Sequence, residues 1–93
     1  MNYFVYVISS GSKSNLVTYV GYTNNLKKRL SLHNKGKGAK FTKGRLWKII
    51  YSENFKTKGK ALSREYYIKK NRKFRNLIKK NINEKKNSHT FTT

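Results

Sequence analysis

The stretch "TYVGYTNNLKKRLSLHN", residues 18 to 34, passes from a strand-like run into a basic, helix-like run within a few positions. Aromatic and β-branched residues dominate its first part, and leucines at helical spacing follow in its second part. The stretch also brings Tyr19, Arg29 and His33 close together in the sequence. A tyrosine, an arginine and a histidine around one strand-to-helix turn mark a candidate site, and the rest of the chain decides what that site can do.

The residues on either side of this stretch predict two more strands. "YFVYVIS", residues 3 to 9, is apolar on both of its faces, which is typical of an interior strand. Turn-forming residues fill positions 10 to 15, so residues 17 to 23 are expected to pair antiparallel with the first strand as a hairpin. "LWKIIYSENF", residues 46 to 55, predicts a third strand.

The first helix is expected to follow the second strand directly. Asn24, or Thr23 just before it, is a candidate N-cap for a helix that runs to about Asn34. Its inner face is expected to carry three residues at helical spacing: Leu26, Leu30 and His33. A half-buried histidine packed beside two leucines is the plain structural interpretation of His33.

Two more helices are expected after the third strand. Thr57 is a candidate N-cap for the first of them, in which five residues fit an inward stripe: Ala61, Leu62, Glu65, Ile68 and Lys69. The last helix, from about Phe74 to Glu84, is expected to turn three residues toward the core: Leu77, Ile78 and Ile82. The whole pattern predicts an α+β fold with a three-stranded antiparallel sheet, about three flanking helices and the order β-β-α-β-α-α.

The length and composition limit the class of protein. A chain of 93 residues makes one domain with a modest core, here predicted to span residues 1–85 before a flexible basic and polar tail, residues 86–93. The chain carries 23 lysines and arginines against 3 acidic residues, a formal net charge of +20, which indicates a polyanionic partner. Because no stretch resembles a transmembrane span or signal peptide, nucleic acid is favoured over a membrane surface. The chain has no cysteine, so nothing requires an oxidising compartment and a cytoplasmic location is expected.

The loop at residues 35–45 supplies much of this charge. "KGKGAKFTKGR" has no helical or strand period, and it lacks the ending and the setting of a nucleotide-binding P-loop, so we interpret it as a mobile basic arm that lies near a phosphate backbone. With the preceding helix it gives seven candidate nucleic-acid-binding residues: Lys27, Lys28, Lys35, Lys37, Lys40, Lys43 and Arg45.

Glu65 is the most informative single residue. A carboxylate between Ala61 and Ile68 on an apolar helix face is costly to bury without a partner, and an ion pair with a neighbouring lysine or arginine is the structural explanation. The functional explanation is that Glu65 faces the turn that carries Tyr19, where Gly21 leaves room for close approach of a backbone or ligand. Both explanations stay open at this point.

The residue inventory excludes several kinds of site. The chain lacks aspartate and cysteine, so it has no Ser-His-Asp or Cys-His-Asp group, and two histidines with three acids do not readily assemble a zinc site. Metal chemistry must therefore rest on one carboxylate. Mg²⁺ allows this, because it keeps several waters and binds one or two carboxylates together with substrate phosphate oxygens.

The chain carries an ordered set of motifs by which it resembles the GIY-YIG nuclease superfamily. It resembles in particular the small stand-alone members that are related to the catalytic domain of structure-selective endonucleases. The set runs in the family order over roughly residues 2–72: "VYV" at 5–7, "YVG" at 19–21, Arg29, His33, "GKGAKFT" at 36–42 and Glu65. One departure is visible, because Phe4 stands where the family has the glycine that opens its name. Tyr6 is kept.

The resemblance implies a role for each of these positions. Tyr6 and Tyr19 would line the site, and one of them, Tyr19 by preference, would orient or deprotonate the attacking water with help from His33. Arg29 would contact the scissile phosphate, and Glu65 would hold a single Mg²⁺ or Mn²⁺ ion. Cations aimed at the phosphoryl oxygens stabilise the charge that develops during hydrolysis.

These observations favour a metal-dependent endonuclease, acting on DNA more than RNA, with structure or single-strand preference and little base specificity. The resemblance also suggests that the protein acts in DNA repair or recombination, and that a protein partner supplies its specificity. The alternative is a non-catalytic nucleic-acid-binding module, which includes RNA among its ligands and uses the same basic face. A ribonucleoprotein component is a third, weaker hypothesis, because small lysine-rich proteins are common in such particles.

Overall fold

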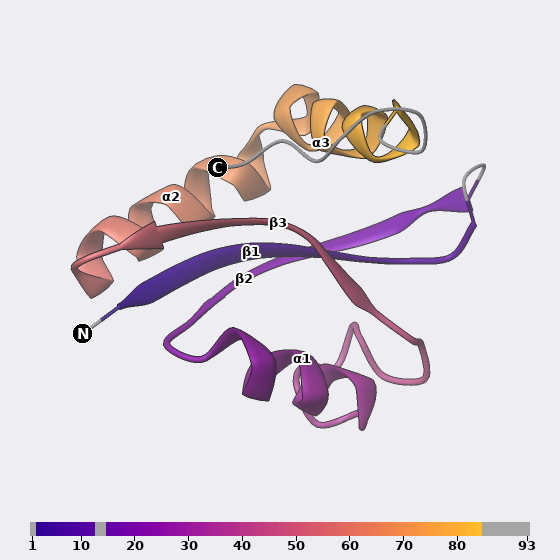
Figure 1. Ribbon diagram of the computed structural model, residues 1–93, viewed down its shortest axis with the longest axis horizontal. Helices are drawn as coiled ribbons and strands as arrows, with labels where there is room; N and C mark the ends of the chain where they lie inside the picture. The colour runs from indigo at the N-terminus through magenta and orange to yellow at the C-terminus, as the bar shows by residue number, and fades with distance from the viewer. Residues whose placement is uncertain (1, 13–14, 85–93) are drawn as a thin grey trace.

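The computed structural model describes residues 2–12 and 15–84, the last three of them by their backbone alone. The elements follow in the order β1 (Tyr3–Ser10), β2 (Val17–Thr23), α1 (Leu26–Asn34), β3 (Lys48–Phe55), α2 (Lys58–Lys70) and α3 (Arg72–Glu84). The strands form one antiparallel sheet, with α1 below it and α2 and α3 above it in Figure 1. The predicted α+β class and the predicted order of elements are confirmed.

β1 lies at the centre of the sheet, whose strand order is β2-β1-β3. Its register pairs Tyr6 with Gly21 of β2 and with Ser52 of β3, and the pairing with β3 shifts between Val7 and Ile8. The expected hairpin and the expected interior strand are both present. Among the described residues, β2 has a strand neighbour on one side only, so its other edge is open.

The upper face of the sheet holds the larger apolar core. Side chains from β1 and β2 pack there against α2 and α3, and the buried members are Val5, Val7, Val20, Ala61, Ile68 and Ile78. Two of the five residues of the stripe predicted on α2, Ala61 and Ile68, are fully buried, whereas Leu62 is exposed. Leu77, expected to face the core, is instead 55% exposed, because Ile78 takes the inward position on α3.

The lower face of the sheet packs against α1 and the segment that leads into β3. Tyr6, Ile8 and Trp47 form its buried cluster, with Leu26 and Leu30 of α1 against it as predicted. β3 begins two residues later than expected, because the Trp47 N–H donates to Asn34 Oδ1 (2.6 Å) and so does not join the sheet. This contact ties the end of α1 to the entry of β3.

The helix starts differ from the predictions in two places. Asn25 caps α1, not Asn24 or Thr23, because its Oδ1 accepts from the backbone N–H of Lys28 (3.0 Å). Thr57 caps α2 as predicted. α3 begins at Arg72, two residues before the expected start.

The loop between α1 and β3 is tied down at Thr42, in contrast to the free basic arm expected from its sequence. Thr42 is fully buried, and its hydroxyl donates to the Ala39 carbonyl (3.0 Å) while its carbonyl accepts from the indole N–H of Trp47 (2.9 Å). The lysines around it remain exposed. The loop thus presents charge from a fixed position.

Some predictions concern residues outside the described part of the chain. The expected tail at residues 86–93, two residues of the expected turn (13–14) and the inward side chain of Ile82 belong to this group. Across the described residues, no helix is both long enough and apolar enough to span a membrane.

Candidate active site

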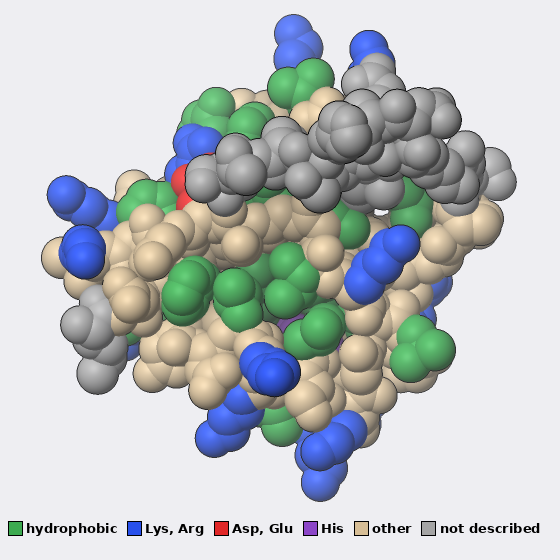
Figure 2. All heavy atoms as spheres, in the orientation of Figure 1, with side chains coloured by type: hydrophobic (Ala, Val, Ile, Leu, Met, Phe, Trp, Pro, Cys, Tyr) green, Lys and Arg blue, Asp and Glu red, His purple; other side chains and the backbone are tan. Residues whose placement is uncertain are grey.

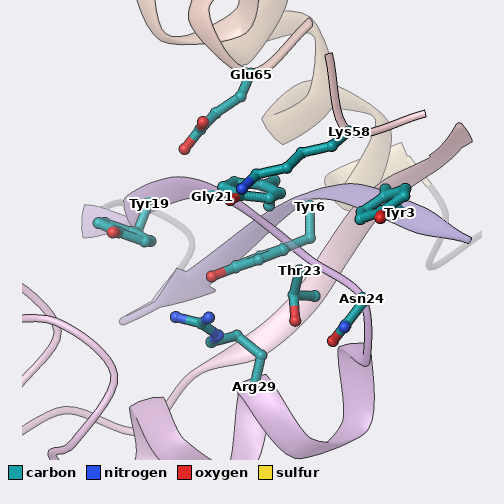
Figure 3. Close-up of a pocket in the computed structure, with 10 residues that line it drawn as sticks. Tyr3, Tyr6, Tyr19, Gly21, Thr23, Asn24, Arg29, Lys58 and Glu65 are labelled. Atoms are coloured by element: carbon teal, nitrogen blue, oxygen red, sulfur yellow. The ribbon is translucent and has the colours of Figure 1, made fainter. Parts of the chain in front are cut away.

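A polar cavity of about 480 Å³ opens at the free edge of β2 (Figure 3). Side chains from four elements line it: Tyr6 from β1, Tyr19 and Gly21 from β2, Arg29 from α1, and Lys58 and Glu65 from α2. Four predicted site residues therefore meet in one place, although α1 and α2 cover opposite faces of the sheet.

The position of β2 at the edge of the sheet explains how the two helices reach each other. Figure 3 shows the carboxylate of Glu65 descending from α2 and the guanidinium of Arg29 rising from α1, on either side of the β2 backbone. An interior strand would have a further strand in this space. The open edge instead leaves a passage in which a cation and a carboxylate face the same volume.

Gly21 makes room for the phenol of Tyr6, its partner across the strands. A Cβ atom at this position would stand 2.5 Å from the Tyr6 hydroxyl oxygen and 2.7 Å from the ring carbon that bears it, far closer than atoms pack. The close approach expected at Gly21 is thus filled by a side chain of the protein itself. This contact fixes the direction in which the Tyr6 hydroxyl points.

Tyr6, His33 and Thr42 form a buried chain of hydrogen bonds behind the cavity. The Thr42 hydroxyl donates its proton to Ala39, so it can only accept from His33 Nδ1, which lies 2.8 Å away. The other ring nitrogen, Nε2, is then unprotonated and accepts from the Tyr6 hydroxyl at 2.8 Å. Gly38 permits this arrangement, because a Cβ there would stand 2.7 Å from the Cγ atom of the His33 ring.

Burial shifts the titration of both aromatic members of this chain. Desolvation raises the pKa of the Tyr6 phenol well above its ordinary value, although the charge of Arg29 opposes part of that rise. Desolvation, and then the charge of Arg29, lower the pKa of His33. Tyr6 therefore holds its proton at neutral pH and His33 is a neutral acceptor. The half-buried histidine of the sequence prediction is in fact fully buried.

Glu65 satisfies both explanations that its sequence position left open. Its Oε2 atom lies 3.1 Å from Lys69 Nζ, one helical turn away, which is the expected ion pair. The same carboxylate lines the cavity with Tyr6 and Arg29. Lys69, predicted to face inward, has a side chain that is 49% exposed, so the pair lies at the cavity mouth and not in the core.

The donor set around Glu65 fits a hydrated divalent ion. The described residues hold no group of three or more histidine or acidic side chains that could enclose a metal. They do hold one carboxylate in an open polar cavity whose volume leaves space for an ion with several of its waters. Among the described residues, Glu65 is therefore the side chain that would hold Mg²⁺ or Mn²⁺.

The predicted basic residues are exposed and do not line the cavity. Seven are exposed on α1 and the following loop: Lys27, Lys28, Lys35, Lys37, Lys40, Lys43 and Arg45. Figure 2 shows blue lysine and arginine side chains projecting around the visible face, with little red acidic surface between them. The sequence pattern did not single out Lys58, although its spacing of seven residues from Glu65 places both on one helix face.

The comparison with known families agrees with this arrangement. The family model described as the GIY-YIG catalytic domain matches residues 2–89 of the chain. The chain belongs to the GIY-YIG family. Members of this family are typically nucleases, so the domain points to nuclease chemistry and to a nucleic-acid substrate.

Similar chains occur in bacteria. A UPF0213 protein of Clostridium perfringens is 48% identical over 88 residues, 90% of each chain. The UPF0213 protein YazA of Bacillus subtilis is 47% identical over 89 residues, which cover 94% of this chain and 84% of the relative. The solution NMR structure of a UPF0213 protein from Bacillus halodurans is 32% identical and covers 84% of this chain and 82% of that one, with a TM-score of 0.46.

Proposed function

We propose that this GIY-YIG domain is an endonuclease that needs one divalent metal ion and hydrolyses phosphodiester bonds in nucleic acid, preferably DNA, with structure or single-strand preference and little base specificity. One observation carries the proposal. Arg29, Glu65 and the phenols of Tyr6 and Tyr19 come from four different elements and line one cavity. The ion pair with Lys69 accounts for Glu65 alone and does not explain why Arg29 and two phenols line the same cavity.

Arg29 acts on the phosphate in this proposal. Its side chain enters the cavity from α1, and its charge is close enough to influence the pKa of both Tyr6 and His33. Hydrolysis adds negative charge to the phosphoryl oxygens, and a positioned cation stabilises that charge in the transition state. Lys58, at the start of α2, lines the same cavity and adds a second positive group for the phosphate backbone.

Tyr6 and His33 act on the attacking water. The Tyr6 hydroxyl donates to His33 Nε2, which leaves the oxygen lone pairs of Tyr6 available to accept from water. As the water attacks phosphorus, Tyr6 takes its proton and passes its own to Nε2, so no free phenolate has to form against the raised pKa. Because of this hydrogen bond, we assign the role of proton acceptor to Tyr6, whereas the family resemblance favoured Tyr19. Tyr19 lines the cavity and borders the water.

Glu65 would hold the divalent ion, which when bound supplies positive charge to the phosphate oxygens and to the leaving oxygen. The Lys69 ammonium already neutralises this carboxylate in the free protein. A cation that binds Glu65 therefore takes the place of the Lys69 ammonium.

A second function also has a specific observation in its favour. The Glu65 carboxylate has a cation partner in Lys69 without any metal, and the seven exposed basic residues named above would bind phosphates in a protein that does not cut. Such binding is independent of sequence and weakens steeply with salt, because it releases condensed counterions.

Cleavage assays with Glu65→Ala separate the two functions. Labelled branched, flapped, single-stranded and duplex substrates are incubated with wild type or variant, with Mn²⁺ or with EDTA. The endonuclease predicts cleavage by wild type that disappears with EDTA and in the variant. If both proteins bind the substrates, with equal or tighter binding by the variant, and neither cuts any of them, the binding module replaces it.

A further inference from the structure

We propose that a second cavity, next to the candidate active site, holds one unpaired nucleotide whose base stacks on Phe41. The inference rests on the proposed function, because it names what lies beside the scissile phosphate. It assigns a base-binding role to a residue that the nuclease chemistry does not use.

The second cavity continues the active-site cavity along the open edge of β2. It has a volume of about 350 Å³, and it is lined by Thr18, Tyr19, Val20, Phe41, Lys69 and Arg75. Tyr19 lines both cavities. The Glu65–Lys69 ion pair also joins them, since Glu65 belongs to the first and Lys69 to the second. A strand of nucleic acid in the first cavity is thereby led into the second.

Phe41 offers an aromatic surface that is both exposed and fixed. Its side chain is 58% exposed, although its neighbour Thr42 is fully buried. The ring stacks on Tyr19, with centroids 6.1 Å apart and planes 21° apart, and its centroid lies 6.3 Å from that of Trp47. These two rings and the buried Thr42 hold Phe41 in place from behind. The exposed surface of the ring is free to stack with a flat base.

The opposite side of the second cavity supplies positive charge. Lys69 lies in the last turn of α2, and Arg75 of α3 is held there because its Nη1 atom donates to the Ile68 carbonyl (2.8 Å) and to that of Lys69. An aromatic surface facing two cations matches the two parts of a nucleotide, a base and a phosphate. An acidic protein segment would use the cations but would not need the exposed ring.

The base in this cavity has to be free of its partner strand. A base stacked inside a duplex has no exposed face to offer to Phe41, and extruding it costs unstacking and unpairing energy. Unpaired bases at flaps, junctions and single strands need little or none of that energy. The stacking contact therefore gives a physical cause for the proposed structure preference, without reading base identity.

Binding experiments in EDTA test this cavity separately from cleavage. The ligands are a single-stranded oligonucleotide and a fully abasic strand with the same number of phosphates. Dissociation constants come from fluorescence anisotropy at one salt concentration. Wild type is compared with Phe41→Ala, and with Leu46→Ala as the matched control, because Leu46 is an exposed apolar residue on the same loop that lines neither cavity.

The expected result is a loss of base preference only in Phe41→Ala. Wild type should bind the base-bearing strand about 5- to 100-fold more tightly than the abasic strand, as for one stacked base. Phe41→Ala should lower this ratio toward one and leave the abasic affinity unchanged, which also shows that the variant is folded. Leu46→Ala should keep the ratio of wild type.

Two outcomes would overturn the base-binding role of Phe41. One is an unchanged affinity ratio in Phe41→Ala. The other is an equal loss for both strands, which indicates a damaged fold or a protein-binding surface instead of a stacking site. A wild type that keeps the ratio but cuts no substrate with Mn²⁺ would remove the endonuclease proposal and leave the nucleotide site in place.

Discussion

The two carboxylates whose surroundings are described, Glu53 and Glu65, are each paired with a cation from α2, but the pairs are built differently. Glu53 accepts from Arg64 through both of its oxygens (Nε to Oε1 3.0 Å, Nη2 to Oε2 2.9 Å) and also from the Tyr51 hydroxyl. The guanidinium lies 4.9 Å from the ring centroid of Tyr67 and 5.0 Å from that of Phe74. Each charge in this group is enclosed by partners.

Glu65 has one cation partner, the flexible Lys69, and it faces a polar cavity. Arginine with a fixed planar fork suits a permanent pair, whereas a lysine ammonium exchanges its partner easily. The difference indicates which carboxylate holds the fold and which is available for a ligand. Burial alone does not distinguish the two carboxylates, because the side chain of Glu53 is 21% exposed and that of Glu65 is 15% exposed.

The largest effect is expected at Glu65 on the reaction rate. Glu65→Gln keeps the size of the side chain and removes its charge, so cleavage should fall by about 10²- to 10³-fold in single-turnover assays with Mn²⁺. The free energy of unfolding in urea should change by less than about 1 kcal/mol, because the Lys69 side chain of this ion pair is 49% exposed and such a pair contributes little. A large loss of stability with unchanged cleavage per folded molecule would reverse the roles of the two carboxylates.

The next effect is expected at Glu53 on stability. Glu53→Gln breaks the two-pronged contact with Arg64, and the free energy of unfolding should fall by about 1 to 3 kcal/mol in urea titrations. Arg64→Lys keeps the charge but loses the fork, and it should also destabilise the protein. Cleavage per folded molecule should equal that of wild type in both variants. A rate loss comparable with that of Glu65→Gln would contradict the comparison.

The stabilising role of Glu53 should also appear in acid unfolding, as a smaller change in the free energy of unfolding. Burial would raise the pKa of Glu53, but hydrogen bonds from Arg64 and Tyr51 outweigh it and lower the pKa below the ordinary value near 4.5. The unfolded chain then binds more protons than the folded one below that pH, so stability falls as the pH drops through the folded pKa. Stability curves of wild type and Glu53→Gln measured by circular dichroism should converge in this window.

His33 provides an internal reference for that experiment. Its pKa is lowered by burial, so it contributes stability that is present above pH 6.5 and lost as the pH falls through its folded pKa. This loss should appear equally in wild type and in Glu53→Gln. The difference between the two curves should therefore stay constant above pH 6, and a difference that changes with pH there would show that the Glu53 substitution perturbs more than its own ion pair.

The smallest effect on stability is expected at Lys69. Lys69→Met removes an i,i+4 pair whose lysine side chain is half exposed, so the free energy of unfolding should change by no more than about 0.5 kcal/mol. The freed carboxylate should bind Mn²⁺ more tightly, which calorimetry without nucleic acid can measure. Weaker Mn²⁺ binding in this variant would argue that Lys69 positions Glu65 instead of competing for it.

The sequence predicted most of the fold because local pattern and packing agree. Residues 3–9 are apolar on both faces, and the strand they form is buried on both faces. Thr57 has the right side chain and neighbours for a cap, and it caps α2. Asn24 and Asn25 are chemically identical, so only the path of the chain selects Asn25.

The site was predicted less completely, because its contacts join distant residues. The predicted residues Tyr6, Tyr19, Arg29 and Glu65 do line one cavity. However, no spacing in the sequence predicts that His33 forms hydrogen bonds with Tyr6 and Thr42. The loop that contains Thr42 has no periodic pattern, so the sequence could not predict that its threonine is buried while its lysines are exposed. The partner of Glu53 likewise became visible only in three dimensions.

The central place of β1 has a consequence for how the chain is made. β1 is synthesised before the other described elements. One of its edges stays unpaired until β3 is made, and its upper face stays incompletely covered until Ile78 is made. At about 5 to 20 residues per second, translation from residue 10 to residue 78 takes roughly 3 to 14 seconds. Throughout that interval a strand with two apolar faces and an unpaired edge is open to wrong partners. The lysines and arginines that follow it in the chain repel other nascent copies, so the positive charge of the chain also protects the strand during synthesis.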